Sequence, residues 1–326
     1  MKPAFSVIFL TTLIGAAQGL FLALFTAQSY ALFNLLPVQN NQSFYAVGAL
    51  LVLILSALGL LSSFFHLGRP ERAWRSAAMW RTSWLSREVI ALPAFMGVVL
   101  LYGAAHFMDW KPAVATLPFG IVIDATLVLG ALAAVLAFAL FLCTAMIYAC
   151  LPFLREWHSP LTVLNYLLLG SASGFALAAA FAASNAPELL RFFAAWALIL
   201  TLLGFASRGA SLLRNARLRP KSTLQTAIGV KHPRIVQKSM GFMGGSFNTR
   251  EFFHGTSVAT LRSVKWGFLL AVFVIPALLL GLGLWSDSPR ALPLAFAVQY
   301  LGLLAERWFF FAQANHPQNL YYQAIA

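Results

Sequence analysis

The sequence is poor in charged residues. Of its 326 residues only 10% are Asp, Glu, Lys or Arg, whereas 60% are hydrophobic and the mean hydropathy is +0.80. A soluble domain carries roughly 25% charged residues. This shortage excludes a water-soluble globular protein of this length and predicts a chain that lies in a lipid bilayer.

Cysteine is almost absent as well. The chain has two, Cys143 and Cys150, and both lie in one apolar segment. An iron–sulfur cluster normally takes about four thiolates, so we expect no Fe–S cluster in this chain. The two thiols are roughly two helical turns apart, which is incompatible with a disulfide. We interpret both as small packing residues.

The six histidines are too scattered for a transmembrane haem. His66 closes the second apolar run and His106 closes the third, so they are expected at opposite faces of the bilayer, about 30 Å apart. The other four lie in segments outside the apolar runs. A haem held by two axial histidines at one depth is therefore not expected, and electrons must be delivered to this chain by another subunit.

Long apolar runs are abundant. A bilayer core needs about 20 apolar residues per helix, and eight runs meet this length: 6–34, 43–66, 88–108, 121–150, 161–183, 190–213, 266–285 and 291–312. The first run follows Lys2 like a signal peptide but continues to Phe33, so we interpret it as a retained helix. The sequence predicts an all-α fold, a single membrane domain of eight transmembrane helices over residues 1–326.

The basic residues are distributed unevenly between the two sides of this bundle. Nineteen of the 22 lie near the N-terminus, the loops 67–87, 151–160 and 214–265, and the C-terminus. Cytoplasmic loops are enriched in Lys and Arg, so we predict a bacterial inner-membrane protein with both termini in the cytoplasm. Topology then explains the net charge of +13, and we do not expect nucleic acid as a partner.

Two of the basic loops have distinct expected roles. The 67–87 segment is short and rich in Trp, which predicts a cytoplasmic interfacial loop, and Pro70 is expected to begin a short helix there. The 214–265 segment has two open interpretations. One is a solvated basic loop beside anionic membrane lipid, and the other is a docking surface for a cytoplasmic partner.

The stretch FFHLGRPERAWRSAAMW at 64–80 carries the strongest functional signal. His66 ends a span, Arg72, Trp80 and Arg81 follow, and Glu88 opens the next span. Ionisable residues at membrane depth are functional candidates. A quinone headgroup fits this set, because its carbonyls need donors such as His and Arg. His or Glu can relay the protons of its reduction, and Arg stabilises negative charge on the ring.

A second candidate lies at the end of the last span. Arg307 follows Glu306, and two interpretations remain open: an arginine that extends its side chain to the interface, or a wall of the quinone site. Neighbouring helical residues point about 100° apart, so the two need not pair with each other. We find no pair of ionisable residues in the middle of a span, which argues against a transporter.

These motifs carry a family resemblance. The HLGRP sequence at 66–70, with Arg72 and Ala73 behind it and Ser86-x-Glu88 after it, resembles the membrane-anchor subunits of the dimethyl sulfoxide reductase family. The resemblance implies three components in one enzyme: a molybdopterin catalytic subunit, a four-cluster ferredoxin-like Fe–S subunit and a haem-free anchor that binds ubiquinone or menaquinone. It implies that His66 and Glu88 are tied to quinone binding, and that molybdenum is held by the partner.

Two further stretches, at 146–175 and 306–323, are similar to the branch of that family that serves cytoplasmic sulfite oxidation. The resemblance therefore implies an anchor that passes electrons from sulfite, through the Fe–S subunit, to the quinone pool. The expected site comprises His66 and Glu88 as catalytic groups with Arg72, Trp80, Arg81 and Arg307 around the quinone. Two alternatives remain: an anchor working in the reverse direction for a quinol-oxidising reductase, and a passive anchor or transporter.

Overall fold

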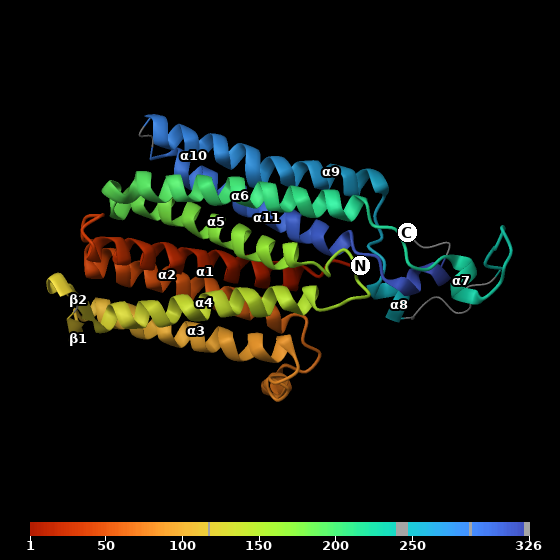
Figure 1. Cartoon of the computed structure of the whole chain (residues 1–326), viewed down its shortest axis with the longest axis horizontal. Helices are drawn as coiled ribbons and strands as arrows, with labels where there is room; N and C mark the ends of the chain where they lie inside the picture. The colour runs from red at the N-terminus through yellow and green to blue at the C-terminus, as the bar shows by residue number, and fades with distance from the viewer. Residues whose placement is uncertain (117, 239–246, 287–288, 323–326) are drawn as a thin grey trace.

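The protein is an elongated bundle of long helices that lie roughly side by side (Figure 1). It is seen in a computed structural model that describes residues 1–116, 118–238, 247–286 and 289–322. Within these ranges eight helical segments are long and apolar enough to cross a membrane. In chain order they are α1 (Phe5–Leu32), η1 with α2 (Asn41–Ala46, Val47–Phe64), α3 (Trp84–Phe107), α4 (Ala125–Ala149), α5 (Pro160–Asn185), η4 with α6 (Pro187–Leu189, Leu190–Ala216), α9 with η5 and α10 (Val258–Leu269, Leu270–Val274, Ile275–Ser286) and α11 (Ala291–Ala312).

The eight predicted spans are thus confirmed, and so is the all-α class. Two helices begin earlier than their apolar runs because a serine caps them. Ser83 accepts a hydrogen bond from the backbone N–H of Ser86 at 3.3 Å, so α3 begins at Trp84 instead of residue 88. Ser257 likewise accepts from the N–H of Thr260 at 3.1 Å, and α9 begins about two turns before residue 266.

A small β-hairpin was not expected from the sequence. Strands β1 (Ala113–Thr116) and β2 (Val122–Asp124) pair antiparallel, and β2 occupies the first residues assigned to the fourth span. Asp124 ends the hairpin and caps α4, because its Oδ1 accepts a hydrogen bond from the N–H of Leu127 at 2.9 Å. The predicted start of that span at residue 121 is therefore wrong, because the helix begins at Ala125, directly after β2.

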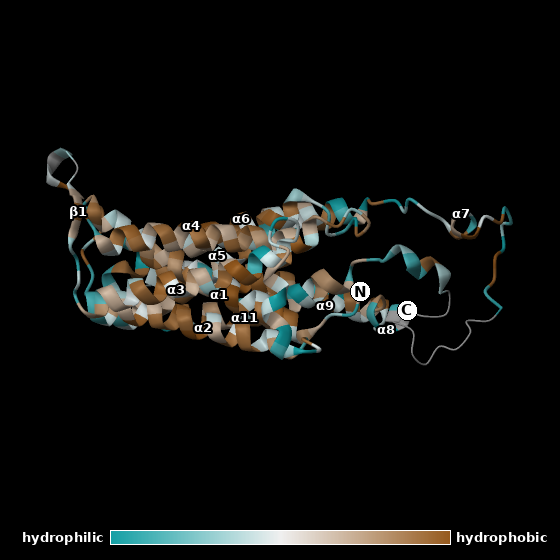
Figure 2. Ribbon diagram, turned by 90° about the horizontal axis from the view of Figure 1, so that it is seen from below, coloured by the Kyte–Doolittle hydropathy of each residue, from teal (hydrophilic) through white to brown (hydrophobic). Residues whose placement is uncertain are grey.

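The two ends of the bundle differ in what they carry. Both chain termini lie at one end, with the 65–83 segment, the connection between α4 and α5, and the 217–257 segment (Figure 1). We call this the basic end, and we call the other, which carries β1 and β2, the hairpin end. Figure 2 shows apolar residues along the spans and hydrophilic residues at their ends.

Helices α1 and α5 cross at the centre of the bundle. Glycines recur every fourth residue on both, in GAAQG at 15–19 and GSASG at 170–174. A Cβ atom added to Gly174 would lie 2.1 Å from the carbonyl carbon of Gly19, so only glycine allows this approach. Small residues at such spacing let membrane helices pack backbone to backbone. The crossing holds together the helices that surround the candidate site.

The 217–257 segment extends beyond the basic end. The described parts of this segment, 217–238 and 247–257, include α7 (Leu224–Ile228) and α8 (Phe247–Glu251), and the chain that follows α7 extends further from the bundle than α7 itself (Figure 2). The segment is joined to both termini: the N–H of Lys2 donates to the carbonyl of Glu251 at 2.9 Å, and the Tyr321 hydroxyl donates to the carbonyl of Ala227 at 3.1 Å.

The two cysteines are both unpaired, as expected. Cys143 is buried in α4 and fits the prediction of a packing residue. Cys150 is exposed at the end of that helix, so the same interpretation is wrong for it. The reason is its position, because Cys150 is the residue at which α4 stops.

Candidate functional site

A small cavity lies inside the bundle near its basic end, where α1, α3, α4, α5 and α11 meet. Its volume is about 20 Å³, and we call it the inner cavity. Its polar lining includes Glu88, Thr144, Tyr166 and Arg307. A space of this size holds about one water molecule. Glu88 and Arg307, two of the predicted site residues, are therefore brought together around a space the size of a water molecule.

Glu88 reaches the cavity because of its place on α3. It lies one turn inside the capped start of the helix, on the same buried stripe as Leu92, Phe95 and Val99. Its side chain is 8% exposed, and its Oε1 accepts a hydrogen bond of 2.5 Å from the Thr144 hydroxyl of α4. A buried carboxyl group within a membrane helix is costly unless it is paired, so its position indicates a role beyond packing.

Arg307 belongs to a buried cluster of three charged groups. Glu306 lies between two arginines: its Oε1 is 2.7 Å from Nε of Arg208, and its Oε2 is 3.3 Å from Nη1 of Arg307. The exposed fractions are 0% for Glu306, 1% for Arg208 and 4% for Arg307. We call these three residues the charged triad. With both arginines protonated and the glutamate ionised, the triad carries one net positive charge.

Aromatic rings complete the surroundings of the triad. The guanidinium carbon of Arg307 lies 3.7 Å from the ring centroid of Tyr166, and that of Arg208 lies 5.6 Å from the ring centroid of Phe268. Such cation–π contacts stabilise a desolvated arginine by roughly 2 kcal/mol. The contact with Tyr166 fixes Arg307 beside the inner cavity, so its positive charge faces the space that Glu88 also lines.

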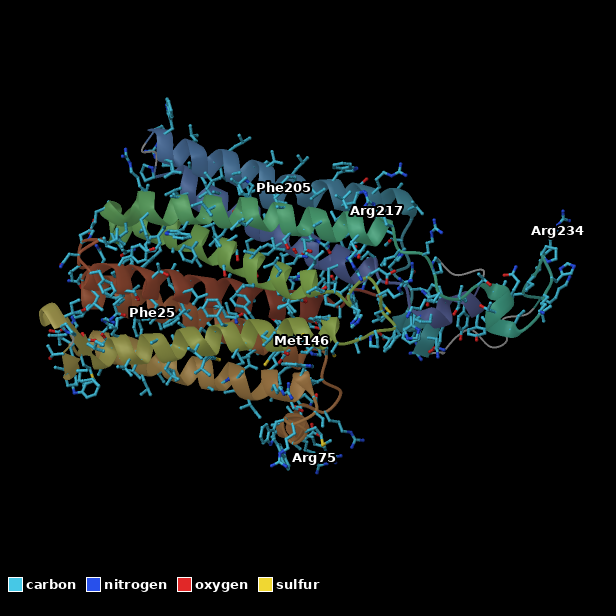
Figure 3. The ribbon with its side chains drawn as sticks, viewed as in Figure 1. Phe25, Arg75, Met146, Phe205, Arg217 and Arg234 are labelled. Carbon is cyan, nitrogen blue, oxygen red and sulfur yellow. The ribbon has the colours of Figure 1, made fainter. Side chains whose placement is uncertain are left out.

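The other four predicted residues lie elsewhere. His66, Arg72, Trp80 and Arg81 are all exposed, on the 65–83 segment between α2 and α3. This segment contains η2 (Pro70–Ala77), the short helix expected to begin at Pro70, and η2 packs against α3. In Figure 3 the segment that carries Arg75 lies to one side of the bundle. The structure therefore brings Glu88 and Arg307 together and leaves the remaining four at the surface.

The exposed segment has its own pattern of contacts. Arg72 lies 3.8 Å from Glu71, and the guanidinium carbon of Arg81 lies 5.3 Å from the ring of Trp80. Trp80 itself is 53% exposed. Arginines beside exposed tryptophans are typical of the membrane–water interface. The placement of 67–87 along the interface stays a prediction.

Arg208 is a buried charge that the sequence pattern did not indicate, and the same holds for the environment of Glu306. The distribution of basic residues places Arg208 with the charges of the basic side, but it is fully buried on α6, where its Nε contacts Glu306 of α11. The expectation of an arginine that extends to the interface is wrong for Arg307, and Glu306 does pair with it. The available signal was the position of Arg208, an ionisable residue within the last turns of an apolar run.

The ligand chemistry of the site is that of hydrogen bonds and charge. Across the part of the chain that the structure describes, no three His, Cys, Asp or Glu side chains gather as a metal site would require. The cavity walls present hydroxyl, amide, carboxyl and guanidinium groups. Such a set can bind and protonate a polar oxygen.

Comparison with known proteins gives two matches. The sequence model of the DMSO reductase anchor subunit (DmsC) matches residues 1–304. The chain is also 59% identical, over its whole length and over the whole of the relative, to a protein of Allochromatium vinosum that is named as a subunit of sulfite dehydrogenase. The full-length match covers every helix that forms the inner cavity, and the family model covers them up to residue 304, before Glu306 and Arg307.

Proposed function

Because the chain belongs to the family of dimethyl sulfoxide reductase anchor subunits, we propose that it passes electrons from an Fe–S partner to a quinone in the membrane. The observation that carries this proposal is that Glu88 and Arg307 line the same inner cavity. A carboxyl group can transfer protons, and a fixed positive charge stabilises negative charge that develops on a reduced ring.

Sulfite is the proposed electron source of the complex. The full-length relative that is 59% identical has the name of a sulfite dehydrogenase component, and this is the support for that substrate. A molybdopterin partner would oxidise sulfite to sulfate, a four-cluster Fe–S partner would carry the two electrons, and the quinone would take them up with two protons. In this chain we assign only the quinone step.

The ring itself needs more room than the inner cavity offers. A space for one water does not hold a quinone ring. We therefore assign the inner cavity to proton handling and place the ring beside it, at the 65–83 segment that packs against α3. There His66, Arg72, Trp80 and Arg81 offer donors and an aromatic surface to a headgroup that arrives from lipid.

His66 has the protonation state that this role requires. Although His66 lies at the surface, the protein around it removes part of its hydration, and this desolvation lowers the pKa of its imidazole below the ordinary value of about 6.5. The ring is then neutral at pH 7, so it can donate one N–H to a quinone carbonyl without carrying a charge at the edge of the bilayer. Glu88, on the neighbouring helix, then supplies the proton.

The basic end is proposed to face the cytoplasm, with the Fe–S partner bound there. Nineteen of the 22 basic residues belong to this end, which supports a cytoplasmic orientation of both termini. The 217–257 segment extends beyond the bundle and carries Arg234 at its far end (Figure 3). It offers a basic surface for the partner.

Glu88→Gln and His66→Ala test the assignment in the purified complex. We expect each variant to reduce quinone-coupled sulfite oxidation by roughly 10²-fold or more, the usual effect of losing a group that transfers protons. Sulfite oxidation with ferricyanide should stay unchanged, because that acceptor takes electrons from the partner proteins. Glu188→Gln, exposed and away from the cavity, is the matched control. If both variants keep quinone coupling, the site lies elsewhere in the bundle.

A further inference from the structure

A second, much larger cavity opens at the basic end. Its volume is about 920 Å³, and we call it the basic pocket. Its walls come from the connection between α4 and α5, the last turn of α6, residues 218–222, α9, and the end of α11 with the residues that follow it. The volume is within the range of small-molecule sites, roughly 300–1,000 Å³. None of the groups assigned to the quinone lines it.

The pocket lies at the depth of lipid headgroups. Lys265 lines it from α9, and the next residue, Trp266, is exposed with the Lys265 ammonium 5.3 Å from its ring. Exposed tryptophans beside lysines mark the interface between headgroups and acyl chains. The floor of the pocket includes the apolar side chains of Leu212 and Phe309, which belong to spans.

The charge of the lining is strongly positive. Four cations line the pocket, Arg155, Arg219, Lys221 and Lys265, against one carboxylate, Glu156. His316 adds no charge, because burial and the nearby N-terminal ammonium lower the pKa of its imidazole. A neutral ligand would leave these cations without compensation, whereas basic pockets between membrane helices on this side bind anionic headgroups.

We propose that the basic pocket binds an anionic glycerol phospholipid, with its phosphate on the lysine and arginine side chains. The phosphate oxygens accept hydrogen bonds from the arginine and lysine side chains that line the pocket. The apolar floor beside Leu212 and Phe309 receives the first part of an acyl chain. This site is separate from the inner cavity and independent of the proposed quinone chemistry.

Lipid retention by the intact purified complex tests the proposal. The complex is stripped with detergent and incubated with phosphatidylglycerol or with phosphatidylcholine, and bound lipid is counted by native mass spectrometry. We expect phosphatidylglycerol to be retained and phosphatidylcholine not. Each lysine removed, in Lys265→Gln and Lys221→Gln, should weaken retention by about fivefold, the usual contribution of one basic residue near an anionic headgroup.

Controls separate this site from general electrostatics. Lys111→Gln removes the same charge at the hairpin end, far from the pocket, and should leave retention unchanged. Assembly of each variant is checked by size-exclusion chromatography. Four results would each overturn the proposal: equal retention of phosphatidylcholine, displacement by inorganic phosphate, displacement by a short-chain quinone, or retention unaffected by Lys265→Gln.

Discussion

The two ends of the bundle bury polar side chains in different ways. At the hairpin end the fully buried polar groups are neutral. The Tyr102 hydroxyl donates to Gln28 at 2.9 Å, the Gln28 amide donates to Thr126 at 2.8 Å, and the Thr126 hydroxyl donates to Asp124 at 2.7 Å. This series of hydrogen bonds links α1, α3 and α4, and its one carboxylate, that of Asp124, lies at the edge of the bundle.

At the basic end charged side chains are buried as well as neutral ones such as Asn165 and Ser207, and two of the charged ones line the inner cavity. The charged triad joins α6 to α11, and Arg307 faces the inner cavity. The hairpin end shows that neutral side chains can join helices in this protein. Buried ion pairs contribute little net stability compared with apolar packing, because desolvation costs several kcal/mol per ion. The charges at the basic end are therefore better explained by function than by packing.

The largest expected effect comes from removing the carboxylate of the triad. Glu306→Gln leaves Arg208 and Arg307 buried without a counter-charge, which should destabilise the protein by about 3–5 kcal/mol. The thermal midpoint of the purified complex, followed by tryptophan fluorescence, measures this loss. Glu188→Gln, at an exposed site of the hairpin end, should change stability by less than about 0.5 kcal/mol. An unchanged midpoint for Glu306→Gln would mean that the triad does not carry buried charge.

Much of the arrangement could be predicted from hydropathy and charge. Apolar runs report the free energy of placing each segment in lipid, so the eight spans and their basic end are visible along the chain. Glu88 could be identified because an acidic residue at membrane depth, next to a basic loop, does not help to orient the protein in the membrane. Arg307 could be identified from its position at the end of a span. Of its two interpretations, a side chain that extends to the interface is wrong, because Arg307 is buried.

The rest depends on which helix faces lie together. Arg208 lies inside the predicted run 190–213, but its pairing with Glu306 depends on the contact between α6 and α11 near the basic end. The close crossing of Gly19 with Gly174 joins residues that are far apart in the chain. No window of local hydropathy contains such contacts, since they are set by the packing of whole helices.

A smaller effect is expected at the hairpin end. Tyr102→Phe removes one hydroxyl from the series of hydrogen bonds at the hairpin end and leaves the side-chain amide oxygen of Gln28 without this donor. The cost should be about 1–2 kcal/mol, the range for a buried hydrogen bond whose acceptor stays unsatisfied. The same thermal midpoint measures it, and Tyr30→Phe, at a half-buried tyrosine of α1, serves as the control. A loss as large as that of Glu306→Gln would remove the difference between the two ends.

The smallest effect on stability should come from replacing the whole triad. In Arg208→Met/Glu306→Leu/Arg307→Met no charge is left unpaired, and apolar side chains of similar volume fill the contact between α6 and α11. We expect a stability within about 1 kcal/mol of the unaltered protein, because apolar replacements of buried ion pairs are often neutral or stabilising. Quinone-coupled sulfite oxidation should nevertheless be lost, while ferricyanide-coupled oxidation remains, since the positive charge beside the inner cavity is gone. If the variant is stable and still reduces quinone, the triad is a structural feature and the two ends differ only in composition.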